Sequence, residues 1–262
     1  MDAESAKPIN VNTVGKHPFV TQAFKDALEV DNLLADSTPF NIEPSYQRLP
    51  NEYEFYILRV GSSLASLLHL CQQLDQALFY MSNCRITQSM KNAEIDRPSH
   101  LIYNIENYLI RTQMLYDRVL QVVNAVAHLC NSEENCTHKI IIENLKVKQT
   151  SLPVLLKSLK KQLSKYIATR NQIIHHASYS DNNLRRLAFM SLNLRGNSKL
   201  MDSNPDLVKD VPEFVNYLAR DIVRDKKFEF TRFNTKIFKE VMSILDELQA
   251  RYEEEKKRLA IA

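Results

Sequence analysis

The clearest regularity in the sequence is a stripe of apolar and small side chains between residues 99 and 130. Its members recur every three or four positions, which is the period of one face of an α-helix. They are Ile102, Ile105, Leu109, Thr112, Leu115, Val119, Val122, Val126 and Leu129. Ser99 follows Pro98 directly and is the predicted N-cap. The length of the stripe predicts the central column of a helical bundle.

Other stretches show the same period over shorter lengths. The sequence predicts further helices at residues 19–34, 52–81, 211–223 and 231–259, and one that begins at about Ser151. Residues 1–18 are polar and contain two prolines and a glycine, so we expect a flexible arm. Gly196 and Pro205 indicate irregular loops after residue 184. On the polar flank of the central helix lie Glu106, Arg111 and Arg118, to which the pattern assigns no role.

These patterns predict the fold class all-α, in one domain formed by residues 19–262. The predicted bundle core is about 51–179 together with the C-terminal helix 231–259. A hydrophobic content of 44% suffices for one sizeable core. The chain has only three glycines, which argues against Rossmann folds and phosphate-binding loops, because those normally need several glycines at special backbone angles.

The net charge and the cysteines limit the partners and the cellular compartment that we expect for the protein. The net charge of +3 makes the whole chain no strong attractor of nucleic acid, although local clusters of lysine can bind phosphate. Neither an apolar run long enough for a membrane span nor a signal-peptide pattern is present, so we expect a cytoplasmic protein without a membrane partner. The cysteines at 71, 84, 130 and 136 are expected to be reduced thiols.

One group of residues has the donor types of a zinc site. His128, Cys130, Cys136 and His138 fall within eleven consecutive residues, HLCNSEENCTH. Their spacing matches no standard zinc module, and Cys130 continues the apolar stripe of the central helix. We therefore predict no metal site, with zinc as the alternative for these four residues.

The stretch YIATRNQIIHHASYS, residues 166–180, carries the candidate chemistry. Apolar positions from Leu152 to Tyr166 define a helix stripe whose next member is Arg170. Asn171, His175 and Tyr179 follow at intervals of four along the adjacent edge of the same predicted helix. A guanidinium in a core stripe needs a partner. Either an internal carboxylate such as Glu106 neutralises Arg170, or the stripe faces a cleft or a second subunit.

An arginine, an amide and a histidine suit cleavage of RNA without a metal or another cofactor. A histidine that titrates near neutral pH moves the protons when the 2'-hydroxyl attacks the neighbouring phosphate, and an arginine stabilises the charge of the transition state. Four lysines upstream form a basic face suited to an RNA backbone: Lys157, Lys160, Lys161 and Lys165. The alternative is a buried arginine–carboxylate pair with incidental histidines.

The segment RNQIIHH, residues 170–176, resembles the arginine–polar–three residues–histidine motif of the HEPN superfamily. The segment YNIENYLIRTQMLYDRVLQVVN, residues 103–124, resembles the long helix before that motif in a prokaryotic branch. The resemblance covers residues 99–179 and implies an up-and-down bundle of HEPN type with additional N- and C-terminal helices. Ala177 stands where HEPN toxins that are controlled by a partner nucleotidyltransferase carry tyrosine.

The resemblance also implies a function. The superfamily includes endoribonucleases of toxin and phage-defence systems, some with an antitoxin or another regulatory partner, which form homodimers with a composite cleft. Arg170 and His175 would be the catalytic pair and Asn171 the supporting residue, with His176, Tyr179 and Glu106 as further candidates. One alternative is a catalytically silent HEPN module that binds RNA, a nucleotide or a partner protein. Another is a structural helical adaptor.

Overall fold

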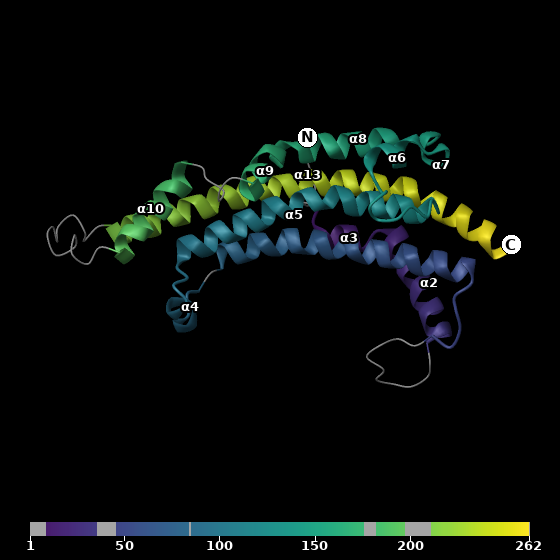
Figure 1. Cartoon of the computed structure of the whole chain (residues 1–262), viewed down its shortest axis with the longest axis horizontal. Coiled ribbons are helices and arrows are strands. Elements are labelled where there is room, and N and C mark those ends of the chain that lie inside the picture. The colour runs from purple at the N-terminus through teal and green to yellow at the C-terminus, as the bar shows by residue number, and fades with distance from the viewer. Residues whose placement is uncertain (1–8, 36–45, 84, 176–181, 197–210, 262) are drawn as a thin grey trace, which may run out of the picture. The chain divides into compact units, whose positions relative to one another are not determined.

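The described ranges are mostly helical and contain no β-strand beyond an isolated bridge between Ala35 and Tyr46, which confirms the predicted all-α class (Figure 1). The computed structural model describes residues 9–35, 46–83, 85–175, 182–196 and 211–261, of which 172, 175, 192–196 and 211 are described by their backbone alone. The elements are α1 (Val11–Gly15), α2 (Pro18–Leu34), α3 (Glu52–Ser82), α4 (Gln88–Asn92), α5 (Arg97–Val126), α6 (His138–Glu143), α7 (Leu145–Lys148), α8 (Leu152–Leu163), the 3-10 turn η1 (Ser164–Tyr166), α9 (Ile167–His175), α10 (Asn182–Gly196) and α13 (Val211–Ile261).

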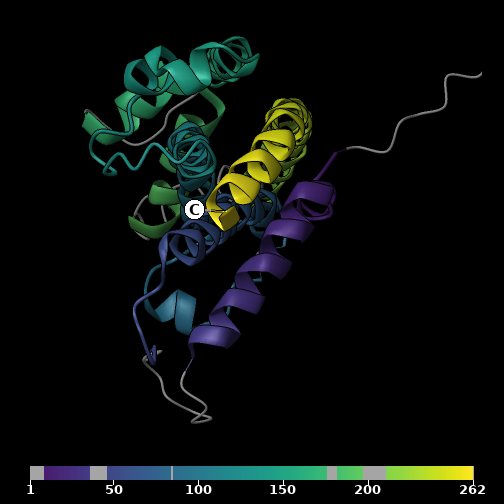
Figure 2. The ribbon, with the colours of Figure 1, turned by 90° about the vertical axis from the view of Figure 1, so that its right-hand side faces the viewer.

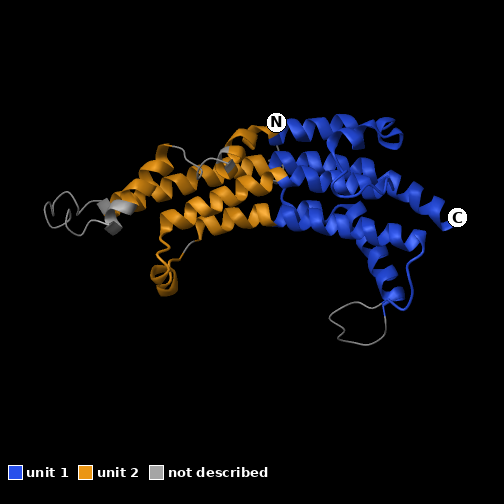
Figure 3. Ribbon diagram, viewed as in Figure 1, with its two compact units in different colours: residues 1–72, 114–163, 235–262 blue, residues 73–113, 164–234 orange. Residues whose placement is uncertain are grey.

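The chain forms two compact units, each assembled from distant segments (Figure 3). Unit 1 comprises residues 1–72, 114–163 and 235–262, and unit 2 comprises residues 73–113 and 164–234. The long helices α3, α5 and α13 each contribute residues to both units.

In unit 1 an aromatic cluster joins α2, α3 and α13. Tyr252 lies between Phe19 and Tyr56, with ring centroids 5.3 and 5.9 Å away. Its hydroxyl donates to the buried carboxylate of Asp26 at 2.7 Å, and Lys256 adds an ion pair to the same carboxylate at 2.5 Å. Figure 2 shows α2 in purple beside the yellow C-terminal part of α13, which is the pair of segments that these contacts connect. The cluster therefore fixes α2 on the core.

Two local features define α3 within unit 1. Asn51 and Glu54 form a reciprocal capping box, in which each side chain accepts a hydrogen bond from the other residue's backbone N–H at 2.8 and 2.9 Å. Arg48 donates to both carboxylate oxygens of Glu54 at 2.6 and 2.5 Å. Gly61, buried further along α3, permits close contact with α2, since a Cβ there would lie 2.6 Å from the Cβ of Ala27.

The end of α5 differs from the prediction, because the helix stops at Val126 and does not reach Cys130. The side chain of Asn124 bonds both the backbone N–H and the carbonyl of Asn131, which closes the turn. His128 and Cys130 have left-handed φ values of 48° and 55°, which end the α-helical conformation. Cys130 is therefore an exposed loop residue and not a member of the apolar stripe.

In unit 2 a buried polar chain connects α3, α5 and α13. The ring of Tyr108 stacks on Phe230 with centroids 3.9 Å apart, and its hydroxyl donates to Asn234 at 2.8 Å. The amide of Asn234 in turn donates to Asp75 at 2.9 Å. Because a buried hydroxyl and amide need partners, this chain satisfies them at the cost of fixing three helices in one register.

Unit 2 also contains two departures from the predicted elements. The N-cap of α5 is Asp96 and not Ser99, because the Asp96 carboxylate accepts the backbone N–H of Ser99 at 2.8 Å, and Pro98 falls in the first turn. The stretch predicted to form loops contains α10. Its buried face consists of Leu184, Leu187 and Ser191. Their spacing of three and four is typical of one helix face, but the pattern is short, and the nearby glycine and proline led to the prediction of loops.

The two helices predicted at 211–223 and 231–259 are one continuous helix, α13. The linking residues contain neither glycine nor proline, and Lys226 pairs with Glu229 across one turn at 3.2 Å. At the other end of the chain, the predicted arm includes α1, where Val14 is buried, while residues 1–8 lie outside the described residues. None of the helices in the described ranges has the length and apolar character of a membrane span.

Candidate active site

The segment that carries Arg170 is anchored through Tyr166, at the last position of η1. This buried tyrosine packs its ring edge against Phe233, with centroids 4.8 Å apart. Its hydroxyl donates to the carboxylate of Glu229 on α13 at 2.7 Å. The sequence stripe included Tyr166 only as an apolar residue, and the hydrogen bond to Glu229 has no signal in the periodicity. Tyr166 and Glu229 thus position the start of α9.

The same carboxylate holds Lys165, one of the lysines predicted to contact RNA. Lys165 pairs with Glu229 at 3.0 Å, and its ammonium lies 4.7 Å from the ring centroid of Tyr166. Burial raises the pKa of Glu229, but hydrogen bonds from Tyr166 and Lys165 outweigh it, so the net pKa is lowered. The charge of Lys165 is therefore partly balanced inside unit 2.

The helix predicted to run without interruption through Arg170 is broken by η1. Three residues of a 3-10 helix turn the chain by about 360°, against about 300° for three α-helical residues. Positions after Tyr166 are therefore rotated by roughly 60° relative to the stripe of α8. The predicted stripe members before the break are buried, whereas Ile174 after it is 44% exposed. The apolar stripe does not continue into α9.

Arg170 is half-buried on α9 and has donors to spare. One terminal guanidinium nitrogen donates to the side-chain oxygen of its neighbour Asn171 at 3.0 Å. The Nε atom is buried and has no hydrogen-bond partner, and Arg170 forms no ion pair with a carboxylate of the described residues. Glu106, the predicted internal partner, is half-buried on α5 in the same unit and does not pair with Arg170. Asn171 is exposed and orients one end of the guanidinium.

The other members of the predicted site lie at or beyond the end of α9. His175 is the last residue of the helix and is described by its backbone alone. His176 and Tyr179 lie outside the described residues. Since α9 is α-helical from Ile167 to His175, Arg170 and His175 are about 140° apart around its axis.

Three of the predicted RNA-binding lysines, Lys157, Lys160 and Lys161, are exposed on α8 in unit 1. The ammonium of Lys160 lies 5.9 Å from the ring centroid of Tyr116. Tyr116 shares a hydrogen bond with Nδ1 of His138. Burial, and then the positive charges of Lys160 and Lys157, lower the pKa of His138. The sequence indicates this histidine only as an alternative zinc ligand, and its link to the basic face through Tyr116 has no signal in the spacing.

The four residues weighed as zinc ligands have separate surroundings. His128 stacks on Tyr56 with ring centroids 5.3 Å apart, and His138 bonds Tyr116. Cys130 is exposed, while burial raises the pKa of the Cys136 thiol to about 11. Within the described ranges no three histidine, cysteine or acidic residues are grouped as metal ligands.

The arrangement around Arg170 is suited to binding an oxyanion. A guanidinium carries five N–H donors, and here one side is fixed by Asn171 while the buried Nε is unpaired. Oxygen atoms of a phosphate or carboxylate accept such donors strongly.

Comparison with known proteins identifies the family. The sequence model of the HEPN_Cthe2314-like HEPN family matches residues 59–249, which is more than half of the chain. No curated protein and no solved structure matches the sequence. The matched range includes α9, the central helix α5 and most of α13. The chain belongs to the HEPN_Cthe2314-like HEPN family.

Proposed function

We propose that the protein is an endoribonuclease that cleaves RNA by attack of the 2'-hydroxyl on the adjacent phosphate, with no need for a metal ion. The observation that carries this proposal is the half-buried Arg170, whose Nε is unpaired and whose guanidinium is oriented by Asn171. Membership of a HEPN family supports it. Toxin activity or phage defence is the setting that the HEPN resemblance suggests for such an enzyme.

In the proposed reaction the 2'-oxygen forms a bond to phosphorus and the bond from phosphorus to the 5'-oxygen breaks. His175 accepts the proton of the 2'-hydroxyl, and the departing 5'-oxygen receives a proton from the second imidazole of the composite cleft. Arg170 stabilises the charge that develops on the phosphoryl oxygens. The products are a 2',3'-cyclic phosphate and a 5'-hydroxyl. The proposed cleft is formed by two protomers, because Arg170 and His175 are about 140° apart on one helix.

The test is cleavage of total RNA in EDTA by the purified protein and by its His175→Ala variant. General acid–base catalysis contributes about 10²- to 10⁴-fold, so the variant should lose at least about 100-fold in rate. His69→Ala, at an exposed histidine of α3, is the matched control and should retain activity. Circular dichroism must show equal helicity for all three proteins.

The products decide the mechanism. An oligonucleotide with a single 2'-deoxy position should resist cleavage there, and cut ends should carry cyclic phosphate. Equal cleavage by the parent and His175→Ala would contradict the assignment of His175. Absence of cleavage in all preparations, together with RNA binding that Arg170→Ala weakens, would favour a catalytically silent binding module instead.

A further inference from the structure

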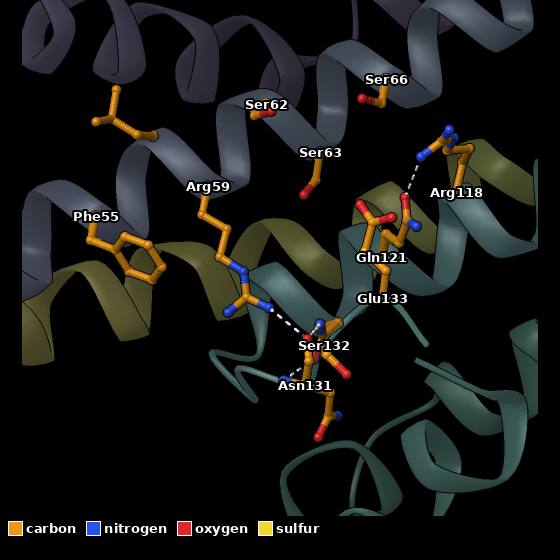
Figure 4. Close-up of a pocket in the computed structure, with 12 residues that line it drawn as sticks. Phe55, Arg59, Ser62, Ser63, Ser66, Arg118, Gln121, Asn131, Ser132 and Glu133 are labelled. Atoms are coloured by element: carbon orange, nitrogen blue, oxygen red, sulfur yellow. Dashed lines mark hydrogen bonds between the residues drawn. The ribbon is translucent and has the colours of Figure 1, made fainter. Parts of the chain in front are cut away.

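A pocket of about 500 Å³ opens on unit 1 between α3, α5 and the loop that follows α5. Figure 4 shows Arg59 extending from α3 toward the loop residues Asn131 and Ser132, and Arg118 beside Gln121 on α5. The lining combines guanidinium, hydroxyl and amide groups with the apolar side chain of Phe55. This volume is in the usual range of small-molecule sites, about 300–1,000 Å³.

The pocket contains two guanidiniums that are not committed to carboxylates. Arg59 donates to the carbonyl oxygen of Asn131 at 3.4 Å, which is a long hydrogen bond, and Arg118 donates to Gln121 at 2.8 Å. Both arginines are half-buried, and neither forms an ion pair with any acidic residue in the described part of the chain. Because each guanidinium has five donors, most of the donors are free for a ligand.

Hydroxyl groups from one helix add to these donors. Ser62 and Ser66 are one turn apart on α3, and Ser63 lies between them, half-buried on the pocket wall. The opposite wall is held in place by the two hydrogen bonds between Asn124 and Asn131. The pocket therefore has a fixed loop on one side and a row of small hydroxyl donors on the other, which reduces the ordering cost of binding.

The charges of the lining favour a small anionic ligand that spans the pocket. Arg59 and Arg118 contribute two positive charges, and Glu133, which is exposed at the loop, contributes one negative charge. Figure 4 shows the two guanidiniums apart, at opposite ends of the lining, so one can hold a phosphate group while the other donates to another oxygen of the same ligand. A continuous RNA backbone would bring additional phosphates toward Glu133 and would be repelled there. Glu133 can instead accept a hydrogen bond from a hydroxyl of a small ligand.

We propose that this pocket binds a small phosphorylated molecule, with Arg59 and Arg118 donating to oxygen atoms at its two ends and the α3 serines as additional donors. This binding site goes beyond the proposed nuclease activity, since its residues belong to unit 1 and do not include the motif on α9. Phe55, which is 47% exposed, provides an apolar surface for the rest of the ligand.

The experiment measures the melting temperature of the full chain with ribose 5-phosphate, with ribose, with inorganic phosphate and with sodium chloride at matched ionic strength. Ribose 5-phosphate and inorganic phosphate should raise the melting temperature in a saturable way, whereas ribose and chloride should not. Arg59→Gln and Arg118→Gln should each weaken ribose 5-phosphate binding by about tenfold or more, because a charge-assisted hydrogen-bonding group is lost. Arg220→Gln, at an exposed arginine of α13, makes the same charge change and should bind like the parent.

A second variant guards against loss of folding. Ser63→Asp places a carboxylate on the pocket wall between two intact arginines, so it should abolish the response to ribose 5-phosphate while the unliganded protein melts at or above the parental temperature. Equal responses to phosphate and chloride, or parental binding by Arg59→Gln and Arg118→Gln, would overturn the proposal. A response only to a short RNA, lost in Arg118→Gln, would also overturn it and assign the pocket to an RNA backbone. RNA cleavage is measured separately, so failure of the nuclease proposal leaves this result unaffected.

Discussion

The arginine on α9 and the two arginines of the unit 1 pocket all lack a carboxylate partner among the described residues, but they differ in the residues that surround them. Arg170 bonds the residue next to it in sequence, and Nε of its guanidinium is buried and unpaired. Arg59 and Arg118 come from different helices and line opposite ends of a pocket completed by a loop. All three are half-buried and have no carboxylate partner among the described residues.

The difference teaches what each site needs in order to be complete. The pocket has donors from three segments of one chain, so it is expected to bind its ligand in a single protomer. The α9 segment has Arg170 and His175 on different sides of one short helix, so it is expected to need a second copy. Ligand binding in the pocket is therefore expected of a single chain, whereas RNA cleavage is expected to require a dimer.

The largest effect should come from mixing two inactive variants. Arg170→Ala and His175→Ala homodimers should each lose about 100-fold or more of the cleavage rate. A heterodimer of the two retains one arginine and one histidine in the shared cleft. We expect it to cleave at least about tenfold faster than either homodimer. The measurement uses co-expression with two affinity tags, sequential purification and an RNA cleavage assay in EDTA.

Two results would contradict the proposal that the α9 site is shared between two protomers. A heterodimer as inactive as its parents would mean that one Arg170 and one His175 from different protomers do not form a working cleft. A monomer in sedimentation at the concentrations used for cleavage would contradict the composite cleft altogether. Ribose 5-phosphate binding by a protein with Arg170→Ala serves as the folding control, since the pocket lies in unit 1.

Much of the fold could be predicted because helix periodicity is a local signal. The stripe of the central helix and the helices at 19–34 and 52–81 agree with α5, α2 and α3 to within a few residues. Errors occurred where a side-chain contact decides an end, as with Asp96 at the start of α5 and Asn124 near its end. Another error was the interruption predicted between residues 223 and 231, where the structure has one continuous helix, α13.

The candidate sites show the same difference between contacts that are local in sequence and contacts between distant residues. Arg170 and Asn171 are neighbours in the chain, and their contact follows from a motif that a single sequence displays. The pocket residues Arg59, Arg118 and Glu133 are far apart in sequence, and only the folded chain brings them together. Glu229, which anchors the start of α9, lies 63 positions from Tyr166, so no spacing rule could have found it.

A smaller effect is expected from Gly61→Ala, which probes the close contact behind the pocket helix. Alanine normally stabilises a helix interior by about 0.5–1 kcal/mol relative to glycine. Here the new Cβ would lie 2.6 Å from the Cβ of Ala27, so α2 or α3 must shift, and such overpacking costs about 1–3 kcal/mol. We expect a net loss of about 1 kcal/mol in urea unfolding and weaker ribose 5-phosphate binding.

Gly15→Ala is the matched control for that experiment. A Cβ at Gly15 meets nothing within 4 Å, and the residue is the last of α1. It should be neutral or stabilise by up to about 0.5 kcal/mol. Equal effects of the two substitutions would show that the contact between α2 and α3 tolerates an added methyl group and that α3 is not held by it.

The smallest effect concerns the start of α3, where hydrogen bonds from Arg48 and from the backbone of Asn51 lower the pKa of Glu54 from 4.5 to about 2. A carboxylate with a depressed pKa in the folded state contributes stability that is fully present above its unfolded pKa. That contribution is lost as the pH falls from about 4.5 toward 2. The melting temperature of Glu54→Gln should therefore lie below that of the parent at pH 6, and the gap should narrow steadily between pH 4.5 and 2.

Glu29→Gln, at an exposed carboxylate 3.9 Å from Lys25, is the control and should give little difference from the parent at pH 6, since exposed pairs contribute little. A gap between Glu54→Gln and the parent that stays constant down to pH 2 would show that the capping box acts through shape and not through charge. That result would also concern the pocket, because α3 forms one of its walls. The pocket helix would then keep its position in acid, and any loss of ribose 5-phosphate binding there would have to come from protonation of the ligand.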